Sequence, residues 1–138
     1  MRTPTPIVLA AALVFATPAL AASQPAAIAE PTQAAAPTET HKIDADGVKL
    51  TVREWGEGEP VICLSGGPGF SADQMLSTAA QVAKAHRAIL VGQRGTAGSE
   101  VPEPFDPSQF SIARAVADLE AVRTGLGLDK ITLVGHSW

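Results

Sequence analysis

Apolar residues recur along the chain with two different spacings, and the first spacing is typical of strands. Over residues 42–55 apolar and polar residues alternate around the turn dipeptide Asp46-Gly47, so this segment predicts a β-hairpin. Three short apolar runs predict further strands, the first of them covered on both faces. These runs are residues 61–64 (VICL), 88–91 (AILV) and 131–134 (ITLV).

The second spacing is helical and lies between the predicted strands. Residues 71–85 predict one helix with Ser71 as its N-cap, and residues 111–126 predict a second, clearer helix. One face of the second helix is apolar: Ile112, Val116, Leu119, Val122 and Leu126. We expect Asp118 and Glu120 to lie on a solvated face with Arg114 and Arg123, as surface ion pairs.

This order of elements predicts the fold class. Strands that alternate with helices require crossover connections, which favour parallel pairing. We therefore predict an α/β fold whose mostly parallel sheet is opened by an antiparallel hairpin. No internal repeat is visible.

The first 40 residues do not read as part of that fold. Arg2, the ten-residue apolar run at residues 7–16 and the small residues Ala19 and Ala21 are typical of a signal peptide, residues 1–21. Residues 22–40 are rich in Ala, Pro and Thr and predict a disordered linker. The folded domain is then expected over residues 41–138, and the protein is expected to be secreted or periplasmic, with no stable membrane anchor.

Composition narrows the function classes. Ten Lys and Arg against 14 Asp and Glu give a net charge of -4, which argues against a nucleic-acid-binding protein. The single cysteine, Cys63, excludes an internal disulfide and a multi-cysteine metal site. It lies in an apolar strand and is expected to be a buried, inert thiol. No cofactor or metal site is predicted.

The strongest chemical signal is Gly135-His136-Ser137-Trp138, directly after the last predicted strand. Gly-x-Ser at the end of a buried strand is typical of a nucleophile elbow, in which a tight turn exposes the serine hydroxyl. We predict Ser137 as the catalytic nucleophile and the backbone N–H of Trp138 as an oxyanion donor. Gly135 is expected to be required because a side chain there would crowd the turn.

A second signal follows the strand at residues 61–64. The run Ser65-Gly66-Gly67-Pro68-Gly69 can place a backbone N–H near the nucleophile, and Gly67 is the candidate oxyanion donor. An ordinary βα turn is the alternative. A phosphate-binding loop fits less well because the lysine and the Ser/Thr of that motif are missing.

Together these segments resemble the α/β-hydrolase superfamily, and more closely its prolyl iminopeptidase-like serine hydrolases. That family has His-Gly-Gly-Pro-Gly, Asp-Gln-Arg-Gly-x-Gly-x-Ser and Gly-x-Ser-Trp-Gly motifs. Here residues 65–69 read SGGPG, residues 92–99 read GQRGTAGS and residues 135–138 read GHSW. The resemblance implies that Ser137 is the nucleophile and that Gly67 and Trp138 supply oxyanion N–H groups.

The chain departs from the family pattern at two positions. Ser65 replaces the histidine that braces the first loop, and its hydroxyl could supply part of that bracing. Gly92 replaces an aspartate, so the loop that carries Arg94 is expected to be anchored differently. We expect Arg94 to brace this loop rather than to contact substrate.

The acidic and histidine members of the triad follow the nucleophile in this family. We therefore expect residues 41–138 to be the N-terminal part of an α/β-hydrolase fold ending at the nucleophile elbow, and to be inactive alone. None of the three histidines is expected to be the base: His41 falls near the linker, His86 at a helix end, and His136 is expected to point into the scaffold.

The implied reaction is removal of an N-terminal residue, often proline, from a small peptide through an acyl-enzyme. Ester or lactone hydrolysis uses the same groups and is the first alternative. A non-catalytic short product, either an unstable remnant or a binding module, is the second.

Overall fold

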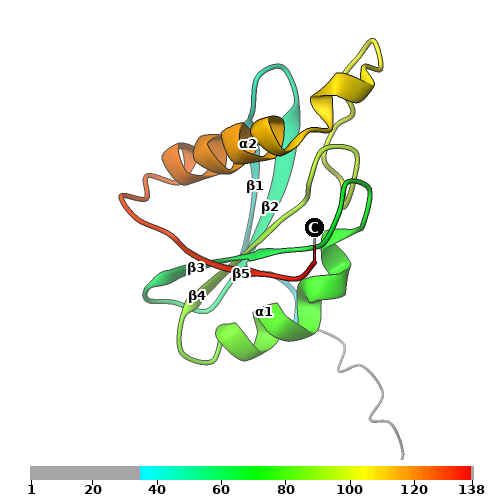
Figure 1. Ribbon diagram of the computed structural model, residues 1–138. Helices are drawn as coiled ribbons and strands as arrows, with labels where there is room; N and C mark the ends of the chain where they lie inside the picture. Colours follow the sequence, from blue (N-terminus) through cyan, green and yellow to red (C-terminus); the bar gives the residue numbers. More distant parts are fainter. Residues whose placement is uncertain (1–34, 138) are drawn as a thin grey trace, which may run out of the picture.

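The computed structural model describes residues 35–137 (Figure 1). The predicted signal peptide, most of the predicted linker and Trp138 lie outside the described residues. No helix within residues 35–137 has the length and apolar character needed to cross a membrane.

Five strands form one mixed sheet in the order β1-β2-β4-β3-β5. The strands are β1 (Glu39–Asp44), β2 (Lys49–Trp55), β3 (Pro60–Leu64), β4 (Arg87–Val91) and β5 (Thr132–Gly135). The hairpin β1–β2 joins the sheet through an antiparallel pairing of β2 with β4, whereas β3 pairs in parallel with both β4 and β5. The predicted fold class is confirmed, with an antiparallel hairpin followed by parallel strands.

Two helices lie on opposite faces of the sheet (Figure 1). The helices are α1 (Leu76–Val82), preceded by the 3₁₀ turn η1 (Ala72–Met75), and α2 (Ile112–Gly125), preceded by η2 (Pro107–Gln109). The side chains of Ser71 and Ser111 cap η1 and α2 respectively, which explains where these segments begin.

Each face of the sheet has its own hydrophobic core. Alternate strand residues such as Val52, Ile62 and Ile89 pack on the α2 side, and their neighbours Cys63, Ala88 and Leu90 pack on the α1 side. Because β3 and β4 bury both sets of side chains, they need the continuous apolar runs seen in the sequence.

The N-terminal strand begins earlier than the sequence pattern suggests. β1 starts at Glu39, inside the segment expected to be linker, and the Thr38 N–H donates to the Glu54 carbonyl oxygen at 2.8 Å. His41 therefore lies within a strand rather than in the linker. This strand has no apolar pattern in the sequence, since it begins Glu39-Thr40-His41-Lys42. It forms because its backbone pairs with β2.

The prediction that one apolar face of α2 is buried is also only partly correct. Val122 is fully buried, but Ile112 and Val116 are 63% and 61% exposed. Asp118, expected to be solvated, is buried. In the N-terminal half of α2, the side of the helix that faces the protein therefore includes Asp118 and excludes Ile112 and Val116.

Candidate active site

Ser137 lies just beyond the carboxyl end of β5 with a backbone that few side chains adopt. Its φ is +58°, in the left-handed region that costs about 1–3 kcal/mol for a residue other than glycine. An exposed serine in such a turn after a sheet strand has the backbone geometry of a nucleophile elbow. The elbow predicted from the sequence thus has a structural counterpart, and the catalytic role of Ser137 stays a prediction.

The glycine-rich loop after β3 lies directly against this turn. A Cβ placed on Gly66 would lie 2.8 Å from the His136 carbonyl oxygen and 2.9 Å from Ser137 Cβ. These separations are too short for any residue but glycine. Gly67, the predicted oxyanion donor, has a φ of +45° in the same loop. The structure therefore brings the two sequence motifs together, while the second predicted donor, Trp138, lies outside the described residues.

Gly135 behaves differently from the sequence expectation. A Cβ on Gly135 would meet no described atom within 4 Å, so crowding within residues 35–137 does not explain this glycine. The close approach that was expected at Gly135 occurs instead at Gly66.

Ser65 braces the glycine-rich loop, as the sequence analysis expected. Its buried hydroxyl donates to the Phe70 carbonyl oxygen at 3.2 Å, which closes the loop on itself. The Gln93 side-chain amide donates to the Ser65 carbonyl oxygen at 2.8 Å and approaches its hydroxyl at 3.4 Å. The loop after β4 thus holds the loop after β3 in place, through a contact that has no local signal in the sequence.

Gly92, where the family has aspartate, makes room for another side chain. A Cβ there would lie 2.8 Å from Ser99 Oγ. That hydroxyl donates to the Gly92 carbonyl oxygen at 2.8 Å and accepts from the Thr51 N–H at 2.8 Å. Ser99 therefore anchors the loop of residues 92–99 to β2.

Arg94 and Asp118 form a buried ion pair. Arg94 is 4% exposed; its Nε and Nη2 atoms each lie 2.7 Å from an oxygen of the Asp118 carboxylate. Nη2 also donates to the Ala45 carbonyl oxygen at 2.6 Å. Bracing by Arg94 is confirmed, whereas the solvated position expected for Asp118 is wrong. Helical periodicity could not find this pair, because its partners lie on a loop and a helix that meet only in the fold.

A cavity of about 200 Å³ lies between α2 and the carboxyl ends of the strands, and Ser137 is on its wall. Apolar side chains supply much of the lining, including Leu64, Val91 and Leu119. Gln93, Arg94 and Asp118 add polar groups that are already hydrogen-bonded. The cavity thus offers an apolar surface beside the Ser137 hydroxyl.

None of the histidines is placed as a base for Ser137. His136 is exposed on the cavity wall rather than in the scaffold, and no hydrogen bond links it to Ser137 within the described residues. His86 precedes β4, at the opposite end of the parallel strands. His41 lies on β1, four strands from β5, which is about 19 Å at the usual strand spacing.

Cys63 is fully buried in β3, as expected. Burial raises the pKa of its thiol above the ordinary value, so the reactive thiolate is disfavoured. The sequence expectation of an inert thiol is consistent with this environment.

Comparison with known proteins gives one family match. The sequence model of a family described as alpha/beta hydrolase fold matches residues 59–138. The proline iminopeptidase of Heyndrickxia coagulans is 36% identical over 99 residues, which is 70% of this chain and 33% of that enzyme. The proline iminopeptidase of Lactobacillus delbrueckii subsp. lactis is 35% identical over 89 residues, 63% of this chain and 30% of that enzyme.

Solved structures agree on the fold. Epoxide hydrolase A from Mycobacterium thermoresistibile matches 72% of this chain and 31% of its own, with a TM-score of 0.63 and 28% identity. An alpha/beta hydrolase from Novosphingobium aromaticivorans matches 72% of this chain and 35% of its own, with a TM-score of 0.64 and 25% identity. The chain spans about a third of the length of the curated relatives it matches.

Proposed function

The chain belongs to the α/β-hydrolase fold family, and on that premise we propose that it carries the nucleophile and oxyanion loop of a serine hydrolase. One observation supports this proposal above the others: Ser137 has a left-handed backbone at the end of β5, with Gly66 packed against it. An elbow of this kind exposes a hydroxyl beside backbone N–H groups, which is the arrangement that acyl transfer needs.

The proposed chemistry is nucleophilic catalysis. Ser137 Oγ attacks the substrate carbonyl carbon, and its proton passes to a general base, which the described residues do not supply. The oxygen of the tetrahedral intermediate accepts hydrogen bonds from the N–H groups of Gly67 and Trp138. The intermediate expels the amine or alcohol, which takes the proton, and water then releases the acyl group from Ser137.

We propose an N-terminal prolyl peptide as the substrate. Support comes from the SGGPG, GQRGTAGS and GHSW motifs and from the proline iminopeptidase relatives at 35–36% identity. The apolar pyrrolidine ring of an N-terminal proline suits the apolar lining beside Ser137. Esters and lactones remain the alternative substrates, because the same groups act on them.

The nucleophile can be tested in any form of the protein that turns over substrate. A fluorophosphonate probe should label Ser137, and Ser137→Ala should abolish labelling and lower turnover of a prolyl arylamide by about a millionfold. Ser77→Ala, on the exposed side of α1, is the matched control and should keep both signals. Labelling that survives in the Ser137 variant would place the nucleophile elsewhere.

The same preparation separates the substrate classes. Turnover of prolyl arylamides well above that of nitrophenyl esters supports the peptidase proposal. Ester turnover alone, still dependent on Ser137, would replace it with an esterase. Probe labelling without turnover of either substrate would contradict both proposals.

We also propose that the protein is exported, on the basis of the signal-like residues 1–21. The exported protein should begin at Ala22, as read by N-terminal sequencing or intact mass. Deletion of residues 7–16 should leave the protein inside the cell. An exported protein that retains Met1 would contradict cleavage at this position.

A further inference from the structure

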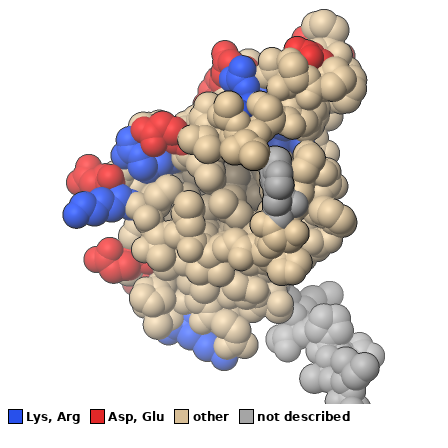
Figure 2. Space-filling model, viewed as in Figure 1, with Lys and Arg blue, Asp and Glu red and all other residues tan. Residues whose placement is uncertain are grey.

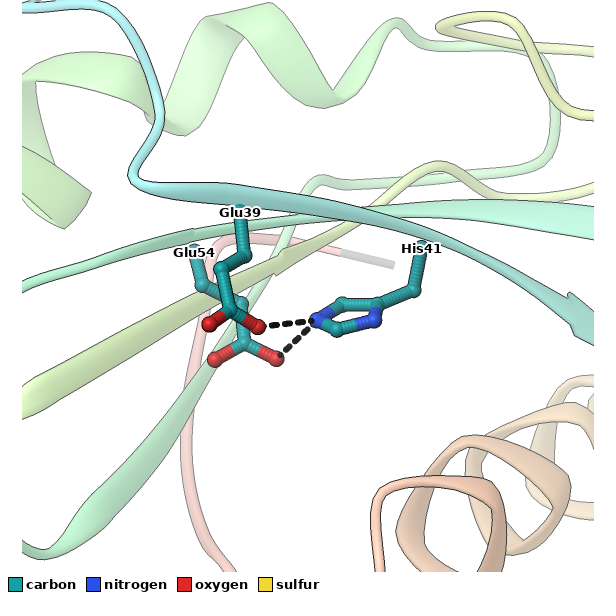
Figure 3. Close-up of side chains that lie close together, drawn as sticks. All are labelled: Glu39, His41 and Glu54. Atoms are coloured by element: carbon teal, nitrogen blue, oxygen red, sulfur yellow. Dashed lines mark ion pairs between the residues drawn. The ribbon is translucent and has the colours of Figure 1, made fainter.

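Three ionisable side chains converge on the β1–β2 hairpin, away from Ser137. Glu39 and His41 stand two positions apart on β1 and so share a face, and Glu54 lies opposite Glu39 on β2. His41 Nε2 lies 3.2 Å from an oxygen of Glu39 and 3.0 Å from an oxygen of Glu54 (Figure 3). One ligand atom from each residue lies within 4.8 Å of the other two.

The imidazole nitrogen at the centre of this cluster has no hydrogen bond. Its two neighbours are close enough, yet among the described residues His41 Nε2 is a buried atom without a partner of acceptable geometry. A hydrogen on Nε2 therefore points at neither carboxylate oxygen directly. Without that hydrogen, Nε2 carries a lone pair, and its two nearest neighbours are carboxylates that can only accept. Only this form, in which Nε2 is deprotonated, leaves a place for a cation between the three side chains.

Arg87 fixes one of the carboxylates without filling that place. Its Nε and Nη2 atoms lie 2.5 and 3.0 Å from the two oxygens of Glu54, whose side chain is 5% exposed. Two carboxylates against one guanidinium leave a net charge of -1 around the His41 imidazole.

We propose that Glu39, His41 and Glu54 form a binding site for a divalent transition-metal ion of the zinc type. Zinc binds histidine nitrogen and carboxylate oxygen at about 2.0–2.2 Å, which places neighbouring ligand atoms of a tetrahedral site roughly 3.3–3.6 Å apart. The two separations from His41 Nε2, 3.2 and 3.0 Å, are slightly shorter, so the side chains would have to move apart by a few tenths of an ångström. A nitrogen ligand disfavours Ca²⁺ and Mg²⁺, which prefer oxygen alone.

Two of the three proposed ligands, Glu39 and Glu54, also border a hollow, whereas His41 is not among the residues that line it. Glu39, Glu54 and Arg87 line a hollow of about 440 Å³ together with Thr38, Gly56, Glu57 and Gly58. Water in this hollow would supply the remaining coordination position. Bound there, the ion would cross-link β1 to β2 through its ligands Glu39, His41 and Glu54. It would stabilise the hairpin and take no part in the chemistry of Ser137.

Zinc binding to the metal-free full chain tests this proposal by titration calorimetry at neutral pH. We expect one Zn²⁺ per chain with a dissociation constant of about one micromolar or less. His41→Ala should weaken binding at least about a hundredfold, because even residues that only orient a ligand contribute about 10–100-fold. Glu39→Gln, at an exposed position, should weaken it as well without disturbing packing. His86→Ala, an exposed histidine outside the cluster, is the control and should bind as before.

Visible absorption of bound Co²⁺ gives a second readout, which reports the ligands directly and needs no enzymatic activity. Co²⁺ should produce visible absorption bands in the original chain and in His86→Ala, but not in His41→Ala, with circular dichroism showing that all three are folded. The proposal is overturned if no metal binds, if binding survives His41→Ala, or if His86→Ala abolishes it. It is also overturned if NMR shows that His41 stays protonated at neutral pH when zinc is present.

Discussion

At the residue scale, the contact between Gly66 and Ser137 couples the two loops of the candidate site. These residues follow β3 and β5, which pair in parallel, so both loops begin at the carboxyl ends of neighbouring strands. The absence of a side chain at Gly66 lets the Ser137 turn approach the oxyanion loop. The position of the nucleophile therefore depends on a residue with no functional group of its own.

Gly66→Ala should consequently damage the site more than the size of a methyl group suggests. The added Cβ would lie 2.8 Å from the His136 carbonyl oxygen, so one of the two loops must move. Because a displacement of about 1 Å can cost about a hundredfold in rate, we expect turnover to fall by at least that factor. Turnover of a prolyl arylamide, with thermal unfolding measured in parallel, checks this.

Gly135→Ala is the contrasting variant, since its methyl would meet no described atom within 4 Å. It should lower turnover much less than Gly66→Ala. Equal losses in the two variants would show that the contact with Ser137 is not what makes Gly66 necessary.

At the element scale, the pair Arg94–Asp118 connects three segments. Arg94 is on the loop after β4, Asp118 is on α2, and the Ala45 carbonyl oxygen belongs to the turn between β1 and β2. The loop that positions Gln93, and through it Ser65, is thereby fixed to the helix. The Arg94–Asp118 ion pair thus supports the loop of residues 65–69, which would hold the oxyanion, through the Gln93–Ser65 hydrogen bond.

Asp118→Ala should strongly destabilise the fold. It leaves the Arg94 charge buried without its counter-ion, a change that typically costs about 3–5 kcal/mol in the free energy of unfolding. Urea unfolding followed by circular dichroism measures the loss.

Glu120→Ala, two residues further along α2, is the matched control for that variant. It removes an exposed carboxylate whose partner, Arg123, is on the same helix, so the unfolding free energy should barely change. An Asp118 variant as stable as the Glu120 variant would mean that the buried pair contributes little.

Sequence patterns predict the elements better than the contacts between them. The runs VICL and AILV locate β3 and β4, and Ser111 marks the start of α2, because these signals are local. Asp118 and His41 are misplaced because their environments are made by distant residues. Helical periodicity puts Asp118 on a solvated face, but Arg94 covers it, and β1 exists only because β2 pairs with it.

At the scale of the whole molecule, the side on which the edge strand β5 lies is sparsely charged. Figure 2 views this side, and Lys, Arg, Asp and Glu lie mostly around its margin. Within residues 35–137, β5 pairs with β3 alone, and Leu133 on β5 is 50% exposed. An unpaired apolar edge of this kind is a template for pairing with another chain.

The 138-residue chain by itself should therefore self-associate in a concentration-dependent way. Leu133→Lys should reduce the association, because a charge on an edge strand opposes pairing with a second copy. Sedimentation velocity measures the size distribution. Val101→Lys adds the same charge at an exposed apolar residue outside the strands and should have little effect. Association that Leu133→Lys leaves unchanged would exclude the β5 edge as its cause.

The strand order has a further consequence, for folding kinetics. β3 lies between β4 and β5, yet its partner residues on β5 follow about 70 positions later in the chain. Closing so long a loop is slow, and it must happen before Ser137 and Gly66 can meet. The hairpin β1–β2 needs no such closure. We therefore expect refolding to form the hairpin early, while the geometry around Ser137 arises only with the last and most distant strand pairing.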